Sequence, residues 1–230
     1  MLTLEEVQFA REGFALDADL SLLPGTRAAV LGPSGGGKST LLDLIAGFEA
    51  PAAGRVLWEG RDLAGRAPGD RPVSILFQEG NLFPHLTLFE NTALGLDPRL
   101  KLTPAQREEV GAILEDVGLG GLETRKPGAL SGGQRARAAL ARVFLRARPV
   151  LLLDEAFSAL GPALKSEMFD LLAQLVPVET VLLMVTHDPE EAARMSEIVV
   201  VDEGRVSPSE PGGPLLADPP PGLARYLGRR

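Results

Sequence analysis

The sequence contains no cysteine, which excludes a disulfide-stapled scaffold and a zinc site built on thiolates. It also lacks basic excess: 23 lysines and arginines stand against 31 acidic residues, and the resulting net charge of −8 argues against a nucleic-acid binder that relies on bulk charge. No apolar run approaches the roughly 18 residues that a membrane-spanning helix needs. The opening segment, MLTLEEVQFAREG, carries acids where a secretory signal has an apolar stretch. These absences predict a soluble intracellular protein.

The apolar residues that are present predict one large α/β domain with an insertion. A chain of 230 residues can bury a full core. The first 23 residues alternate loosely between apolar and polar, with a break at Glu12 and Gly13, which predicts antiparallel strands. Apolar strands that alternate with helices then predict a mostly parallel sheet covered on both faces. These strands are expected at residues 27–31, 55–58, 73–77, 150–154, 181–186 and 198–201.

The middle of the chain reads as helical between residues 88 and 149. Thr103, Pro104 and Gln106 have the spacing of a capping box with Pro at the first helical position. A further helix should begin at Ser131 and end near residue 148. We therefore predict four segments, which are the first part of the core (1–87), a helical subdomain (88–149), the second part of the core (150–206) and an irregular, proline-rich tail (207–230).

A glycine-rich loop follows the predicted strand 27–31 and matches the pattern G-x-x-x-x-G-K-[ST]. Its glycines let backbone N–H groups surround phosphate oxygens, and the N-terminus of the next helix adds partial positive charge. Lys38 should reach the β- and γ-phosphates, and Ser39 should supply a hydroxyl ligand to Mg²⁺. The residues predicted to bind ATP are Gly32, Pro33, Ser34, Gly35, Gly36, Gly37, Lys38, Ser39 and Thr40.

The apolar strand 150–154 ends in two carboxylates, Asp154 and Glu155. In an open parallel sheet, ligands bind beyond the carboxyl ends of the strands. If this strand neighbours the one that precedes the phosphate loop, Asp154 faces the same Mg²⁺. Glu155 is then placed to position and deprotonate a water that attacks the γ-phosphate. Capping of the following helix is the alternative role for these acids.

The segment Leu130-Ser131-Gly132-Gly133-Gln134 predicts a second helix terminus that binds an anion, with Ser131 as the N-cap. One nucleotide does not need two such cradles from one chain. We therefore expect Ser131, Gly132, Gly133 and Gln134 to contact the γ-phosphate held by a second copy, so that ATP joins two copies. Five arginines follow and are expected on a solvated or interdomain face: Arg135, Arg137, Arg142, Arg146 and Arg148.

Together, the phosphate loop, the LSGGQ segment and the VLLLDE strand resemble the nucleotide-binding subunit of an ATP-binding cassette (ABC) transporter, over about residues 2–206. The resemblance implies a P-loop NTPase with a RecA-like core, N-terminal antiparallel strands and a helical signature subdomain. It implies ATP and Mg²⁺ as cofactors and a homodimer that forms upon ATP binding. It further implies an integral membrane permease as partner, a periplasmic solute-binding protein that acts indirectly, no nucleic acid, and a peripheral location on the cytoplasmic face of the membrane.

The resemblance also assigns two residues that no local motif marks. Gln78 matches the glutamine loop, which touches Mg²⁺ or the attacking water and relays the nucleotide state to the membrane partner. His187 matches the switch histidine that contacts the γ-phosphate, although a lone histidine after a strand is more often structural. The implied catalytic residues are Glu155, His187 and Gln78, and the implied Mg²⁺ ligands are Ser39, Gln78 and Asp154.

Three positions depart from the family pattern. Ala156 stands where the family usually has Pro after the catalytic Glu, which should loosen that turn. Gly161 stands where the family has an Asp that reaches towards the partner's phosphate loop, so slow or weakly coupled hydrolysis is expected. The family position for the aromatic residue that stacks on adenine matches Arg11. Phe9 and Phe14 could replace it, or Arg11 could stack through its guanidinium plane.

Within the family, the chain is similar to the ATPases of bacterial thiamine importers, through segments 47–48, 71–78, 81–83 and 95–102. The resemblance implies uptake of thiamine, with iron(III), a polyamine or another small solute as alternatives. Leu82 and Phe83 lie where the family borders a groove that receives a helix of the membrane subunit, and core packing is the alternative. A small-molecule kinase with a phosphate loop is the rival from another class, but it would not need LSGGQ.

Overall fold

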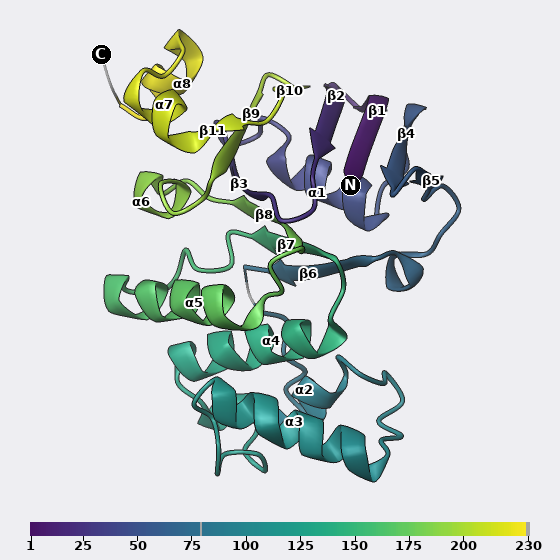
Figure 1. Cartoon of the computed structure of the whole chain (residues 1–230), viewed down its shortest axis with the longest axis vertical. Coiled ribbons are helices and arrows are strands. Elements are labelled where there is room, and N and C mark those ends of the chain that lie inside the picture. The colour runs from purple at the N-terminus through teal and green to yellow at the C-terminus, as the bar shows by residue number, and fades with distance from the viewer. Residues whose placement is uncertain (79, 229–230) are drawn as a thin grey trace. The chain divides into compact units, whose positions relative to one another are not determined.

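The computed structural model describes residues 1–78 and 80–228, which form two compact units. The first unit comprises Met1–Val73, Pro149–Glu155 and Val178–Arg230, and the second comprises Ser74–Arg148 and Ala156–Pro177. Each unit is thus built from separate stretches of the chain (Figure 1). The boundaries of the four segments predicted from the sequence stay a prediction.

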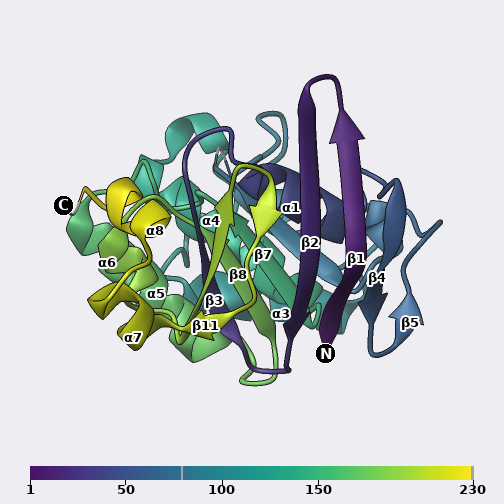
Figure 2. The same cartoon turned by 90° about the horizontal axis from the view of Figure 1, so that it is seen from above.

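The first unit begins with an antiparallel hairpin of β1 (Leu2–Arg11) and β2 (Phe14–Leu22). Figure 2 shows these long strands side by side. Alternate residues of β2 are buried, which is the pattern expected of a sheet with one solvated face. β1 also pairs with β4 (Ala53–Trp58), and β4 pairs with β5 (Arg61–Asp62). The antiparallel strands predicted for the first 23 residues are confirmed.

A parallel layer continues the sheet of the first unit. β3 (Arg27–Leu31) lies between β8 (Val181–Val185) and β9 (Glu197–Asp202), and β7 (Val150–Asp154) pairs with β8. These strands are almost entirely buried, as expected for parallel strands covered on both faces. The connecting elements are β10 (Arg205–Val206), which joins β9 to β2, the helices α1 (Lys38–Ala46) and α6 (Pro189–Ala192), and the 3₁₀ turn η1 (Pro68–Asp70).

The second unit consists mainly of helices. It contains most of β6 (Val73–Phe77), the helices α2 (Leu88–Ala93), α3 (Pro104–Asp116), α4 (Gly132–Arg146) and α5 (Pro162–Leu175), and the turn η2 (Pro127–Ala129). Capping boxes begin three of the helices, at Thr87, Thr103 and Ser131, which confirms the box predicted at Thr103 and the N-cap predicted at Ser131. No helix in the part of the chain that the structure describes is both long and apolar enough to cross a membrane.

The tail departs from the irregular structure predicted for it. β11 (Glu210–Pro211) pairs with β9, and two short helices follow, α7 (Gly212–Ala217) and α8 (Pro221–Tyr226). Pro221 occupies the first turn of α8, where a backbone N–H would have no partner inside the helix. The proline content of the tail therefore marks where helices begin, and the prediction of irregular structure was wrong.

Candidate functional site

The glycine-rich loop connects β3 to α1 and forms the floor of a cleft of about 310 Å³. Two of its glycines are required by geometry. Gly32 has a φ of 150°, and a Cβ there would collide with the carbonyl oxygen of Val201. Gly37 has a φ of 112°, and a Cβ there would lie 2.8 Å from the Phe14 ring. The described residues that line the cleft are Phe14, Ser34, Gly35, Gly37, Lys38, Ser39, Thr40 and Glu155.

Lys38 is held against its own loop. Its Nζ donates to the carbonyl oxygens of Gly32 at 2.7 Å and Pro33 at 2.9 Å. Burial lowers the pKa of Lys38, and the charges of Glu155 and Asp154 partly oppose that shift. The two carboxylates thus help to keep a buried cation charged at the edge of the cleft.

Asp154 lies beside Ser39 although β7, which ends at Asp154, does not pair with β3, the strand before the phosphate loop. β8 lies between β3 and β7, so the condition stated for Asp154, that β7 neighbours the strand before the phosphate loop, is not met. The Ser39 side chain nevertheless lies close enough to Asp154 to lower the pKa of that carboxyl. Burial and then the Glu155 charge raise the pKa of Asp154, while Ser39 and Lys38 lower it. Ser39 can lie beside Asp154 because α1 begins at Lys38, directly after the phosphate loop.

A hydroxyl beside a carboxylate fits a magnesium ion. Mg²⁺ prefers oxygen ligands and is usually held by one or two carboxylates together with substrate phosphates. Among the described residues there is no cluster of three or more His, Cys, Asp or Glu side chains suited to a metal. The pair of Ser39 and Asp154 offers two oxygen ligands of the kind that Mg²⁺ takes together with phosphates.

Glu155 follows β7 directly and adopts a φ of 47°, which is uncommon for a residue other than glycine. Its N–H donates to the carbonyl oxygen of Val185 at 3.1 Å, and its carboxylate lines the cleft. His187 Nδ1 lies 3.7 Å from Glu155 Oε2. The turn around His187 is fixed by Thr186, whose hydroxyl accepts the Asp188 N–H at 3.0 Å. The structure therefore brings both predicted residues to one edge of the sheet.

The three candidates for adenine stacking occupy different environments. Phe14 lines the cleft beside the phosphate loop. Phe9 is buried in the core, with 8% of its surface exposed. The Arg11 side chain is 73% exposed and forms an ion pair with Glu49 at 2.9 Å. The geometry favours Phe14.

The other predicted site residues belong to the second unit. Gln78 follows β6, and its Nε2 donates to Ser158 Oγ at 3.2 Å. The Ser131 Oγ accepts the Gln134 N–H at 3.2 Å, and the Gln134 Oε1 accepts the Ser131 N–H at 2.9 Å. The hydroxyl proton of Ser131 is not used by this cap and can be donated to an anion. Gly133 packs so closely on Leu164 of α5 that a Cβ would displace that side chain.

Two arginines hold backbone segments next to predicted site residues, although no sequence pattern assigned them this role. Arg71 is 5% exposed and donates to the carbonyl oxygens of Leu44 and Ile45, both at 2.9 Å, so it supports the last turn of the phosphate helix α1. Arg142 donates to two carbonyl oxygens in the loop that follows Gln78. Of the solvated or interdomain face expected for the arginines of α4, a fully solvated position does not hold for Arg142, which is half-buried and donates to backbone acceptors.

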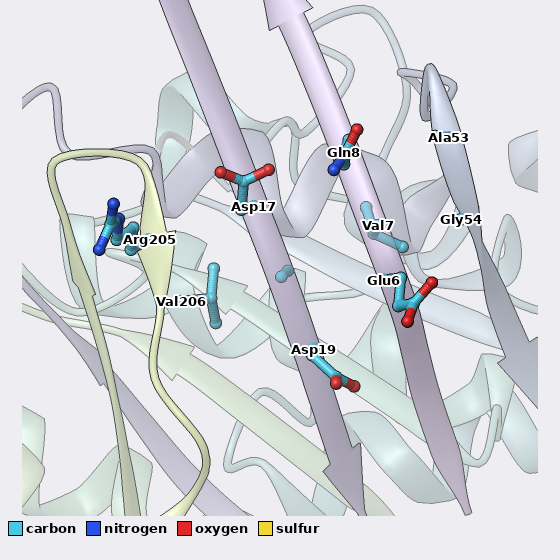
Figure 3. A pocket seen from close by; sticks show the side chains of 10 residues that line it. Glu6, Val7, Gln8, Asp17, Asp19, Ala53, Gly54, Arg205 and Val206 are labelled. Atoms are coloured by element: carbon cyan, nitrogen blue, oxygen red, sulfur yellow. The ribbon is translucent and has the colours of Figure 1, made fainter.

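A separate open groove of about 710 Å³ lies over the first unit's antiparallel strands (Figure 3). Three carboxylates line it, from Glu6, Asp17 and Asp19, together with Arg205 of β10. No residue of the phosphate loop lines this groove, so it is distinct from the cleft at Lys38.

The comparisons with known proteins agree with this geometry. The family model described as "ABC transporter" matches residues 16–158, which include the phosphate loop, the LSGGQ segment and Glu155. The chain belongs to the ABC transporter family, and both the resemblance and the predicted α/β P-loop fold are confirmed.

Individual relatives share most of their length with this chain. The thiamine import ATP-binding protein ThiQ of Cereibacter sphaeroides is 56% identical over 99% of this chain and 100% of the relative. ThiQ of Brucella suis is 46% identical over 99% of this chain and 95% of the relative. A solved structure, a dimeric post-hydrolysis state of the ATP-binding cassette MJ0796 bound to ADP and Pi, has a TM-score of 0.79 and 27% identity over 92% of this chain and 98% of that one.

Proposed function

We propose that this chain is the ATP-hydrolysing subunit of an ABC importer and that it energises the uptake of thiamine through a separate membrane permease. The single observation that carries the ATPase assignment is the cleft in which Lys38, Ser39 and Glu155 line one space, with Asp154 beside Ser39. Identities of 56% and 46% to thiamine import ATP-binding proteins, over 99% of this chain, support thiamine as the solute.

The residues of the first unit divide the work of hydrolysis. The loop amides and Lys38 bind the phosphates, and the N-terminus of α1 adds partial positive charge. Ser39 and Asp154 would hold Mg²⁺, which supplies charge neutralisation when it is bound with the nucleotide. Glu155 orients the attacking water and accepts its proton, and His187 contacts the γ-phosphate beside it. Positioning and electrostatic stabilisation account for most of the rate in phosphoryl transfer.

The LSGGQ helix supplies the second half of the site from another copy of the chain. Ser131 and Gly132 are exposed at the beginning of α4, where unpaired N–H groups and the helix dipole favour an anion. The dimeric state of the MJ0796 structure supports ATP-dependent closure of two copies. The family resemblance supports a role for Gln78 in contacting Mg²⁺ or the attacking water.

A membrane permease is the partner on the cytoplasmic side. Phe83 is 46% exposed, which is uncommon for a phenylalanine, and its ring meets His85 edge to face with centroids 5.9 Å apart. This apolar surface supports docking of a permease segment next to the glutamine loop. A periplasmic binding protein would then act only through the permease.

Two experiments test the proposal. Lys38→Ala should abolish ATP binding measured by titration calorimetry, and retained binding would contradict the nucleotide site. For the solute, the chain is reconstituted in vesicles with the permease and binding protein that co-purify with it, and uptake of radiolabelled thiamine, iron(III) and a polyamine is compared. ATP-dependent uptake of thiamine alone is expected, while uptake of another solute would retain the ATPase assignment and overturn thiamine.

A further inference from the structure

One arginine of the LSGGQ helix, Arg142, is hydrogen-bonded to the glutamine loop that follows Gln78. Arg142 lies near the end of α4, 11 residues after Ser131, or roughly 16 Å along the helix axis. Its Nη1 donates to the carbonyl oxygen of Asn81 and its Nη2 to that of Gly80, each at 2.9 Å. The planar fork of a guanidinium suits two adjacent acceptors, which an ammonium group cannot match in geometry.

The loop that receives Arg142 has an uncommon backbone. Gly80 and Asn81 have φ values of 66° and 45°, both in the left-handed region. The Gly80 N–H donates to the Phe77 carbonyl oxygen at 2.8 Å, so the turn closes directly around Gln78. A Cβ on Gly80 would lie 3.3 Å from the Ala139 Cβ, which shows how closely the turn packs on α4. The turn is therefore held to α4 by packing and by two charge-assisted hydrogen bonds.

Arg142 can hold this turn at any physiological pH because its guanidinium stays charged. Burial lowers the pKa of Arg142, as does the neighbouring Arg146, yet a guanidinium stays charged in proteins. A half-buried charge loses part of its hydration, so the two carbonyl contacts are favoured over leaving the guanidinium without acceptors. Gln78 also contacts Ser158, so two attachments, one from the turn and one from the side chain, fix its position within the second unit.

We propose that Arg142 is a positioning residue that ties the glutamine loop to the LSGGQ helix, so that Gln78 and residues 131–134 of one chain are displaced together. This inference rests on the proposed function and deepens it, because it names what sets the place of Gln78 in each subunit. The helix that meets the nucleotide of a second copy at its first turn thereby also controls a residue that acts in its own subunit. Arg142 touches no substrate and acts only through the loop.

The test is a kinetic cycle on the full-length chain with saturating Mg²⁺. Arg142→Met removes both donors while keeping the length of the stem, Arg142→Lys keeps the charge without the fork, and Gln78→Ala removes the group that is positioned. Arg137→Met serves as the matched control, because Arg137 is an arginine of the same helix that pairs with Glu167 on α5. Melting temperature and amide exchange of the backbone from residue 80 to 86 are measured for each variant.

We expect Arg142→Met to lower kcat about tenfold or more with KM for ATP within about twofold, since a displacement of about 1 Å can cost a catalytic group about 100-fold. Arg142→Lys should restore part of kcat, and Arg137→Met should keep it. Exchange at residues 80–86 should accelerate in Arg142→Met. Adding Arg142→Met to Gln78→Ala should cause no further loss, because residues that act in one unit are not additive.

The outcomes separate this inference from the proposed function. Wild-type kcat in Arg142→Met, or losses that multiply in the double variant, would overturn the positioning role while leaving the ATPase assignment in place. Wild-type turnover in Gln78→Ala would contradict the part of Gln78 in the proposed function, and the inference would fall with it. If Arg142→Met does not fold, the comparison of Arg142→Lys with Arg137→Met decides, and equal kcat in those two would overturn the inference.

Discussion

The Oε2 atom of Glu155 lies 3.7 Å from the Nδ1 atom of His187, at the carboxyl ends of the paired strands β7 and β8. Neighbouring parallel strands bring residues that are 32 positions apart in the chain to the same side of the phosphate cleft. At this distance the Glu155 carboxylate and the His187 imidazole can both contact one reacting phosphate, while the carboxylate stays partly exposed to water. The first prediction follows from this pair.

Glu155→Gln should keep ATP binding and lose turnover. Glutamine has the shape of glutamate but cannot accept the proton of the attacking water, so kcat should fall about 100-fold or more. ATP affinity should change by less than about threefold, because Lys38 and the loop amides remain. The measurements are steady-state phosphate release and equilibrium nucleotide binding, and gel filtration with ATP should show a dimer. Glu190→Gln, at an exposed acid of α6, is the control, and normal hydrolysis by Glu155→Gln would exclude Glu155 as the base.

Phe14→Ala should weaken ATP binding more than any change at the other two candidates. Stacking on a nucleobase contributes about 1–3 kcal/mol, so KM for ATP should rise about fivefold or more. Phe14→Tyr should behave as wild type because it keeps an aromatic face. Arg11→Ala removes only an exposed ion pair with Glu49 and should leave KM within about twofold. A larger effect at Arg11 than at Phe14 would show that the guanidinium carries the adenine contact.

Gly161→Asp should raise the ATPase rate. Gly161 is the N-cap of α5 without a side-chain cap, its φ is −72°, and no atom lies within 4 Å of the place of a Cβ, so aspartate fits without strain. If the missing carboxylate explains slow hydrolysis, kcat should rise about threefold or more, which corresponds to less than 1 kcal/mol in the barrier.

Gly161→Asn separates catalysis from stability in that experiment. Asparagine caps a helix about as well as aspartate, and either residue should stabilise the protein by a few tenths of a kcal/mol over glycine. Thermal unfolding should thus improve in both variants while the rate rises only in the aspartate variant. Equal ATPase rates for Gly161→Asp and Gly161→Asn would show that the carboxylate does not explain the change in hydrolysis.

Asp43→Asn should stabilise the nucleotide-free protein, and more so as the pH rises. Burial, then the charges of Asp154 and Glu49, raise the pKa of Asp43 in α1. The folded state therefore holds this proton to a higher pH than the unfolded state does. Stability contributed by the protonated form is present below the unfolded pKa and is lost as the pH rises through the folded pKa.

The asparagine side chain stays neutral at every pH, so the gain over wild type should be near zero below about pH 4 and about 0.5 kcal/mol at pH 7, after allowing for screening by water. Urea unfolding from pH 4 to 8 measures it. Asp19→Asn, at an exposed acid of β2, should change stability by less than about 0.5 kcal/mol at all pH values. A gain at Asp43 that shrinks with rising pH would contradict the sign.

Local features of this protein could be predicted from the sequence. The strands 73–77 and 150–154 have the expected bounds, because a short apolar run followed by a loop motif determines both ends. The caps at Thr103 and Ser131 were predicted, since a capping box depends only on residues three apart.

Features that depend on distant segments could not be predicted. The insertion of β8 between β3 and β7 depends on strand order, which no local pattern encodes. The acceptors of Arg142 are backbone carbonyls 61 and 62 residues away, and a carbonyl leaves no mark in a sequence. The roles of Gln78 and His187 came from the family resemblance, and local chemistry alone would have left both as ordinary surface residues.

The position of β3 has a consequence for biosynthesis. Arg27 lies opposite Leu182 in the register of β3 and β8, so about 150 residues must be translated before the strand gains either neighbour. At about 5–20 residues per second, the wait is roughly 8–30 s. Throughout that interval the apolar residues 28–31 lack both of their strand partners. Holdase chaperones should therefore engage this protein early, and its yield should depend on them more than its native stability would suggest.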